Sequence, residues 1–178
     1  MGLRATRLLN RLKARLAESR RRAMESRLKE SVAACGDGLR VNGDCVIHGA
    51  SNVRLGNNVN FNGMSIWGAG GVTIGDNFHS AAGCKIFSVN HNYDHGSKIP
   101  YDSTVIHKPV TIEDNVWFGY GVMVMPGSVI REGAVIGAGA VVAGTIDKCA
   151  VAVGNPARVV KYRDIEHYET LKAQRQFL

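Results

Sequence analysis

The sequence lacks the features that mark membrane-spanning, secreted and disulfide-stabilised proteins. Its 178 residues contain no run of 18 apolar residues, so we expect no membrane-spanning helix. The arginine-rich N-terminus has no apolar stretch of the kind found in secretory signal peptides. The four cysteines are far apart and suit neither a compact zinc site nor a disulfide framework: Cys35, Cys45, Cys84 and Cys149. We therefore expect reduced cysteines in a cytoplasmic protein.

Most of the chain has no net charge. The formal net charge is +7, and residues 1–30 account for all of it, with ten arginines and lysines against three glutamates. Residues 31–178 contain twelve charges of each sign. This asymmetry predicts an acidic partner for the first segment and not for the whole domain. A nucleic acid is not expected, because a neutral body would add no contacts along a duplex.

What the sequence has in abundance is a six-residue rhythm. Large apolar residues recur at Ile112, Phe118, Val124, Ile130, Ile136 and Val142. Four residues after each comes a small or apolar one: Val116, Val122, Ser128, Ala134, Ala140 and Ile146. A helix has a period of about 3.6 residues and a simple strand a period of 2, so neither explains the pattern. A period of six is typical of short strands joined by corners, as in a parallel β-helix.

Three copies of one corner support this interpretation. They are VRLGNNV (53–59), VTIGDNF (72–78) and VTIEDNV (110–116). Glycine, asparagine and aspartate suit corners because they tolerate tight or left-handed backbone.

Residues 40–162 resemble the hexapeptide-repeat acyltransferases of the galactoside, maltose and polysaccharide O-acetyltransferase type. The most specific segments are NVWFG (115–119) and VGNPARVV (153–160). The resemblance implies an all-β solenoid, a left-handed parallel β-helix with three hexapeptides per coil, and a homotrimer with active sites between subunits. We expect a basic amphipathic helical segment at 1–34, the β-helix at 35–162 and a short C-terminal helix at 163–178.

The repeat is interrupted by SVNHNYDHGSKIPYDSTVIHKP (88–109). Counting in sixes from Ile86 gives an inward position at 92, and the inward register is expected to resume at Ile106. The sequence therefore predicts an excursion loop of about 14 residues, at 92–105, with His91 at its root. Long loops that leave a rigid scaffold are usually functional.

Acyl transfer from a thioester needs a base for the attacking group and hydrogen-bond donors for the oxyanion. Histidine is well suited to the first task near neutral pH. The resemblance places the catalytic base at His91, 14 residues after Asn77 of the corner motif. It also places the backbone N–H of Tyr120, just after NVWFG, as the oxyanion donor.

The resemblance implies acetyl-CoA as the acyl donor, with no metal. Small outward residues from 137 to 144 would leave a shallow groove for the pantetheine arm, and we expect Gly119, Gly137 and Ala138 to contact it. Arg158 and Lys161 are candidates for the phosphate groups, because cations form charge-assisted hydrogen bonds with phosphate oxygens. No G-x-x-x-x-G-K-[ST] loop is present, so a nucleoside triphosphate is not implied.

The acceptor site is expected to include Asn60 and Trp117, both by resemblance, although Trp117 equally suits a trimer contact. His95 lies in the loop, where it binds substrate or is simply solvated. The predicted function is O-acetylation of a saccharide hydroxyl in surface polysaccharide or lipopolysaccharide synthesis. Amino-sugar N-acetylation and drug acetylation stay open as alternatives, because one base serves oxygen and nitrogen nucleophiles.

Two alternatives belong to other functional classes. The segment VIHGA with His48 superficially resembles the gamma-class carbonic anhydrases, which would make the protein a metal enzyme. Such a site needs three converging histidines, two of them about five residues apart on the coils, whereas His91 and His95 are four apart and His95 falls in the excursion. A β-helix that only oligomerises would be a non-catalytic scaffold, but a loop rooted at a histidine argues against it.

The basic N-terminal segment has an apolar face. Leu8, Leu12 and Leu16 are spaced by four with Leu9 beside them, and arginines flank them at 4, 7, 11 and 15. One interpretation is a helix that caps the open end of the β-helix. The other is a peripheral anchor on an anionic inner membrane face, where lipid-linked sugar acceptors would be found.

Overall fold

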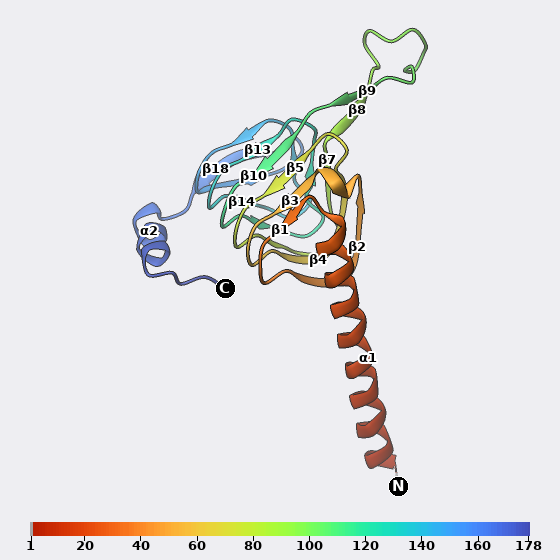
Figure 1. Cartoon of the computed structure of the whole chain (residues 1–178). Helices are drawn as coiled ribbons and strands as arrows, with labels where there is room; N and C mark the ends of the chain where they lie inside the picture. The colour runs from red at the N-terminus through yellow and green to blue at the C-terminus, as the bar shows by residue number, and fades with distance from the viewer. Residues whose placement is uncertain (1) are drawn as a thin grey trace.

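The chain folds into a parallel β-helix with one helix at each end of the sequence (Figure 1). The computed structural model describes the backbone of residues 2–178 and the side chains of residues 6, 7 and 9–178. The long N-terminal helix α1 (Gly2–Ser31) projects from the body, and the short helix α2 (Ile165–Ala173) follows the last coil. No described helix is long and apolar enough to cross a membrane.

The β-helix has three sides. The first is a six-stranded sheet of β1 (Ala34–Cys35), β3 (Val53–Leu55), β5 (Val72–Ile74), β10 (Val110–Ile112), β13 (Val129–Ile130) and β16 (Thr145–Ile146). The second side contains the start of β4 (Asn60–Trp67), then β6 (His79–Ser80), β11 (Trp117–Phe118), β14 (Val135–Ile136), β17 (Ala150–Val153) and the antiparallel β18 (Arg158–Tyr162). The third contains β2 (Arg40–His48), the end of β4, β7 (Cys84–Phe87), β12 (Met123–Val124) and β15 (Val141–Val142). A 3-10 turn, η1 (Ala50–Asn52), precedes β3.

The six-residue rhythm marks the inward positions, as predicted. All six large apolar residues from Ile112 to Val142 are fully buried, and so are their small partners from Val116 to Ala140. Because coils pair in parallel and in register, each inward side chain stacks on its equivalent one coil away, such as Ile112 on Ile130. The core is therefore one continuous apolar column.

The predicted left-handed corners are also present. Asn58, Asn77 and Asn115 have φ values of 54°, 55° and 60°. Their carboxamides form a ladder, because Asn58 donates to Asn77 (3.1 Å) and Asn77 donates to Asn115 (2.9 Å). Asn115 in turn donates to the hydroxyl of Tyr168 in α2 (3.0 Å), so the ladder ties the C-terminal helix to the coils.

The excursion is longer than the sequence predicts. Ile74 and Ile112 are neighbours across the first side although 38 residues separate them, whereas Ile112 and Ile130 are 18 apart. The interrupted coil thus holds 20 extra residues, not about 14. The prediction that Ile106 resumes the inward register is wrong.

Ile106 instead belongs to a two-stranded antiparallel ribbon. Strands β8 (Val89–His91) and β9 (Val105–His107) pair with each other, and Ile106 lies opposite Asn90. The β-forming residues at 105 and 106 resemble a coil strand in sequence, but their partner is the ribbon. In Figure 1 the ribbon and its terminal loop stand clear of the coils.

The root of the ribbon is Ser88 and not His91. Ser88 is fully buried, and its hydroxyl donates to the Trp67 carbonyl (2.7 Å) and accepts from the Gly70 N–H (2.9 Å). Its carbonyl accepts from the N–H of Lys108 (2.9 Å), which closes the base of the ribbon. These bonds anchor the two strands that carry His91 outward.

Helix α1 has two different halves. Leu28 of α1 and Val32, which follows the end of the helix, are buried in the core cluster, and Met24 packs against that cluster. The Glu25 carboxylate accepts the backbone N–H of Val41 in β2 (3.0 Å). This half covers the first coil, as the cap interpretation requires, whereas the N-terminal half leaves the body. Leu8 and Arg4 lie outside the described side chains.

Candidate functional site

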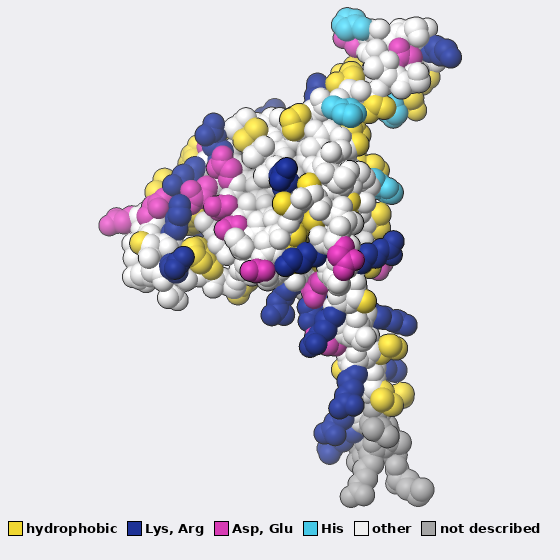
Figure 2. All heavy atoms as spheres, in the orientation of Figure 1, with side chains coloured by type: hydrophobic (Ala, Val, Ile, Leu, Met, Phe, Trp, Pro, Cys, Tyr) yellow, Lys and Arg dark blue, Asp and Glu magenta, His cyan; other side chains and the backbone are white. Residues whose placement is uncertain are grey.

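The ribbon presents His91 to solvent with its ring held by an aromatic neighbour. The His91 imidazole and the Tyr101 ring stack with centroids 3.9 Å apart and planes 16° from parallel. Histidine side chains gather on this projecting part of the molecule in Figure 2. His95 is exposed farther along the loop, and its Nε2 lies 3.5 Å from the Asp94 carboxylate.

The loop beyond the ribbon is organised around Asp102. Its carboxylate accepts the backbone N–H groups of Ser97 and Thr104, each at 2.9 Å. These bonds, that from Ser97 first, hold the pKa of Asp102 below its usual range. The turn that precedes β9 is therefore fixed next to Tyr101, and Tyr101 in turn is placed over His91.

Tyr120 occupies a tight corner between the second and third sides. Its carbonyl accepts the Gly139 N–H (2.7 Å), and the Gly119 N–H donates to Ile136 (2.7 Å). Within the described chain, no protein acceptor takes a hydrogen bond from the Tyr120 N–H. The phenol is 66% exposed, so this side chain does not enter the core.

The corner at Tyr120 is held by contacts with the neighbouring coils. The buried thiol of Cys84 donates to the carbonyl of Gly119 (3.3 Å), and burial raises the pKa of this thiol. A Cβ at Gly119 would lie 2.6 Å from the Ala138 N atom, so close stacking of the coils requires glycine there. Gly121, which follows Tyr120, has a left-handed φ of 67°, and the equivalent turns of the neighbouring coils have Gly83 and Gly139. The turn therefore recurs, and the NVWFG segment before Tyr120 is what distinguishes this corner.

The positions predicted to contact the acyl donor lie along this edge of the β-helix. Gly137 stacks next to Val153, which a Cβ would approach to 2.7 Å, and Ala138 is exposed. Arg158 and Lys161 are exposed on β18, opposite Val153 and Val151. The structure therefore brings Gly119, Gly137 and Ala138 to one edge and puts the two cations on the adjoining strand.

Asn60 and Trp117 share one column on the outside of the second side. Asn60 pairs with His79, and His79 pairs with Trp117, so His79 lies between the two predicted residues. The Asn60 carboxamide oxygen accepts from Asn42 (3.4 Å). The Trp117 side chain is 51% exposed. His79 and Trp117 also line a cavity of about 470 Å³ that α2 and the C-terminal residues border.

His91 and this column belong to different corners of the chain. The ribbon leaves between the third and first sides, after β7 and before β10. The Trp117 column and the Tyr120 corner lie on the second side and at its junction with the third. One chain therefore does not bring the predicted base and the predicted oxyanion donor to the same corner.

Two residues with a place in this geometry were not predicted. Tyr101 stacks on His91, and a hairpin interpretation of 88–109 would have placed it near the ribbon. His79 was given no role from sequence, although the two corner copies VTIGDNF and VTIEDNV are followed by His79 and Trp117 at the same position, which aligns the two residues. Among the described residues, no cluster of three or more histidine, cysteine or acidic side chains is placed to hold a metal ion.

Comparisons with known proteins identify the family. A family model for the bacterial transferase hexapeptide (six repeats) matches residues 109–144. The galactoside O-acetyltransferase of Escherichia coli K12 is 34% identical over 149 residues, covering 81% of this chain and 72% of that protein. The chain belongs to the hexapeptide-repeat acyltransferase family. As a member it is an acyltransferase, which disfavours the metal-enzyme and scaffold alternatives.

Two further similarities bear on what this acetyltransferase does. A galactoside acetyltransferase structure in complex with coenzyme A superposes with a TM-score of 0.72 at 34% identity, covering 80% of this chain and 72% of that one. An E. coli K12 protein, WbbJ, given a provisional role as an O-acetyl transferase in lipopolysaccharide biosynthesis, is 35% identical over 71% of this chain and 66% of its own length.

Proposed function

We propose that this acetyltransferase moves the acetyl group of acetyl-CoA to a hydroxyl of a saccharide, in the synthesis of surface polysaccharide or lipopolysaccharide. The observation that carries the proposal is the exposed His91 imidazole, stacked on Tyr101 at the end of a ribbon with a buried root. The named relatives that act on galactosides and in lipopolysaccharide synthesis support the saccharide acceptor.

The chemistry follows from groups that are placed for it. An imidazole nitrogen of His91 takes the proton of the acceptor hydroxyl as its oxygen attacks the thioester carbonyl carbon. The carbonyl oxygen becomes an oxyanion, and the Tyr120 N–H, which has no acceptor within the described chain, donates to it. The C–S bond then breaks, the electron pair leaves with sulfur, and the His91 imidazolium returns its proton to the coenzyme A thiolate.

The site requires a second copy of the chain. His91 and Tyr120 lie at different corners of one chain, and the ribbon stands clear of its own coils (Figure 1). A closed ring of three copies would allow the ribbon of one chain to reach the Tyr120 edge of its neighbour. We therefore propose a homotrimer with each active site shared between two chains.

The ligands are assigned to the surfaces described above. The pantetheine arm lies over Gly119, Gly137 and Ala138, where small residues leave room at the surface. Arg158 and Lys161 meet the phosphate oxygens. The acceptor sugar packs on the exposed ring of Trp117, and Asn60 orients a hydroxyl, with His95 at the loop side.

The test is thiol release from acetyl-CoA across a panel of acceptors. The panel contains neutral saccharides, the matching amino sugars and simple amines, each with the wild type and the His91→Ala variant. We expect turnover with neutral saccharides that the variant lacks. Turnover confined to amino sugars would replace the proposed O-acetylation by N-acetylation, and turnover unchanged in the variant would refute the mechanism.

A further inference from the structure

The N-terminal half of α1 exposes a leucine stripe that no part of the described chain covers. Leu9, Leu12 and Leu16 are spaced by three and four residues, which aligns them on one side of the helix. Their exposed fractions are 51%, 54% and 54%. Figure 2 shows apolar and basic side chains side by side on the projecting helix.

The stripe points away from the face of α1 that packs on the β-helix. Leu28, which is buried, follows Leu12 by 16 residues, and at about 100° per residue the two lie roughly 160° apart around the axis. Folding of the body therefore leaves the stripe in solvent. The same helix thus buries Leu28 in the core at its C-terminal end and exposes the leucine stripe near its N-terminal end.

The charge around the stripe has one sign. Between residues 6 and 17 the helix carries four basic residues and no acidic one: Arg7, Arg11, Lys13 and Arg15. The nearest acid, Glu18, is paired with Arg21 (2.7 Å) and Arg22 (2.8 Å), and these hydrogen bonds lower its pKa to about 2. The outer half of α1 is therefore cationic.

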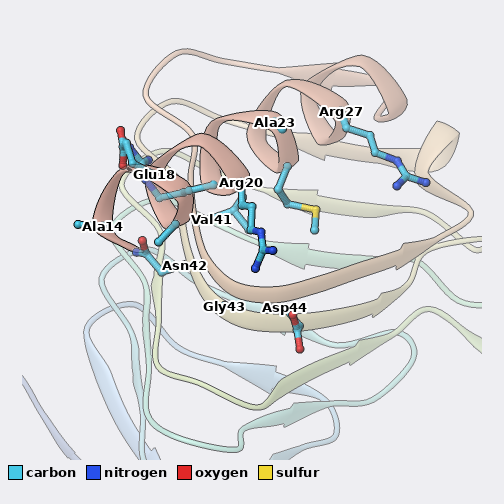
Figure 3. Close-up of a pocket in the computed structure, with 12 residues that line it drawn as sticks. Ala14, Glu18, Arg20, Ala23, Arg27, Val41, Asn42, Gly43 and Asp44 are labelled. Atoms are coloured by element: carbon cyan, nitrogen blue, oxygen red, sulfur yellow. Dashed lines mark hydrogen bonds and ion pairs between the residues drawn. The ribbon is translucent and has the colours of Figure 1, made fainter. Parts of the chain in front are cut away.

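Basic side chains continue the line of the stripe toward the body. Arg20 follows Leu16 by four residues and Arg27 by eleven, which places both near the leucine side. Both are exposed at the rim of a cavity of about 960 Å³ between α1 and β2 (Figure 3). The cationic surface thus extends from the free helix to the point where the helix meets the first coil.

We propose that α1 is a peripheral membrane-binding helix, with Leu9, Leu12 and Leu16 inserted at the headgroup boundary of an anionic bilayer. Its basic residues then lie at the level of the lipid phosphates. A second copy of α1 fits less well, because pairing two stripes would bring four like charges from each helix together without acidic partners. The lipid surface supplies the negative charge that this helix lacks.

The experiment measures vesicle binding by the full-length protein, because Leu28 and Met24 contact the core and a truncation would disturb the fold. Vesicles of pure phosphatidylcholine are compared with vesicles containing phosphatidylglycerol. We expect binding only to the anionic vesicles, weakened by added salt. Replacing Arg11 and Arg15 by glutamine should weaken binding roughly five-fold per charge.

The decisive variant replaces Leu9, Leu12 and Leu16 by serine, and its matched control replaces Ala14 and Ala17, on the same turns but outside the stripe, by serine. The leucine variant should lose vesicle binding while it keeps its mass in solution and its turnover of a soluble acceptor. The control should bind like the wild type. Undiminished binding by the leucine variant, or a change in its assembly state without lipid, overturns the proposal.

Discussion

The rings of His91 and Tyr101 stack with their centroids 3.9 Å apart, and they join a strand of the ribbon to its terminal loop. The contact restricts the orientation of the imidazole, because a ring in face contact cannot turn freely about its side-chain torsions. A proton acceptor that acts on a bound hydroxyl needs such a fixed direction. Tyr101 is therefore expected to act as a positioning residue.

Replacement of Tyr101 by leucine should lower kcat by roughly ten- to hundred-fold, because a misdirected base loses its alignment with the acceptor. The KM for acetyl-CoA should stay unchanged, since Tyr101 lies in the terminal loop of the ribbon and not on the Tyr120 edge. Tyr101→Phe keeps the ring and should restore turnover. Steady-state kinetics of the two variants check this, and equal losses in both would assign the effect to the hydroxyl instead.

His91→Ala should lower turnover by roughly 10²- to 10⁴-fold while coenzyme A still binds. The matched control is His95→Ala, which removes an exposed histidine from the same loop and should mainly alter the apparent affinity for the acceptor. Turnover is measured by thiol release and binding by calorimetry. Near-normal turnover in the His91 variant would show that another group is the base.

Light scattering should give three chains per particle. The shared site also predicts complementation, because mixed trimers of His91→Ala with a Trp117→Ala, Asn60→Ala double variant contain interfaces in which both surfaces are intact. Unfolding and refolding the two weakly active variants together should restore part of the activity. A fully active monomer, or a mixture as inactive as its parents, would contradict the shared site.

Asn115 should be important for stability in two separable ways. Its φ of 60° costs an alanine about 1–2 kcal/mol, and its side chain bonds Asn77 and Tyr168. Each of the two lost hydrogen bonds costs about 0.5–1.5 kcal/mol, so Asn115→Ala should lower the free energy of unfolding by about 2–5 kcal/mol. Asn115→Gly should cost less, because glycine accepts this φ. Urea unfolding at fixed protein concentration measures both, and equal effects would remove the backbone contribution.

Glu132 should make α2 sensitive to acid. Burial would raise the pKa of its carboxyl, but hydrogen bonds from Lys172 and Tyr168 outweigh burial and lower it below the usual 4.5. The carboxylate therefore stabilises the fold above about pH 4.5, and this contribution is lost as pH falls through the lowered value. Glu132→Gln should be less stable than wild type at pH 7, and the difference should shrink toward pH 3. Unfolding curves at both pH values test this, with Glu169→Gln, a more exposed partner of Lys148, as the control.

The β-helix was predictable from the sequence because a six-residue period is compatible with only one arrangement of the strands. Six large apolar residues, spaced by six from Ile112 to Val142, can share one buried column only in a coil whose sides each hold one hexapeptide. Asn58, Asn77 and Asn115 identified three corners for the same local reason, since asparagine tolerates left-handed backbone. The positions of Trp117 and Tyr120 follow directly from this count.

The excursion was only partly predictable. Val105 and Ile106 have the composition of a coil strand, and a local pattern does not reveal which strand will pair with them. In the folded protein β9 pairs with β8 and not with a coil strand, so the ribbon starts at Ser88 and the Tyr101 ring stacks on His91. Ring contacts between residues ten apart depend on hairpin register, and six-residue periodicity carries no information about it.

The sequence by itself determined the coil, its corners, the family and the cationic amphipathic character of the first 30 residues, because each depends on local spacing. Only the tertiary structure decided that Leu28 is buried while Leu12 is exposed, and that His91 stands away from Tyr120 in one chain. These outcomes depend on the direction in which α1 and the ribbon leave the β-helix. That direction is set by packing at Leu28 and by hydrogen bonds at Ser88, between residues that are distant in sequence.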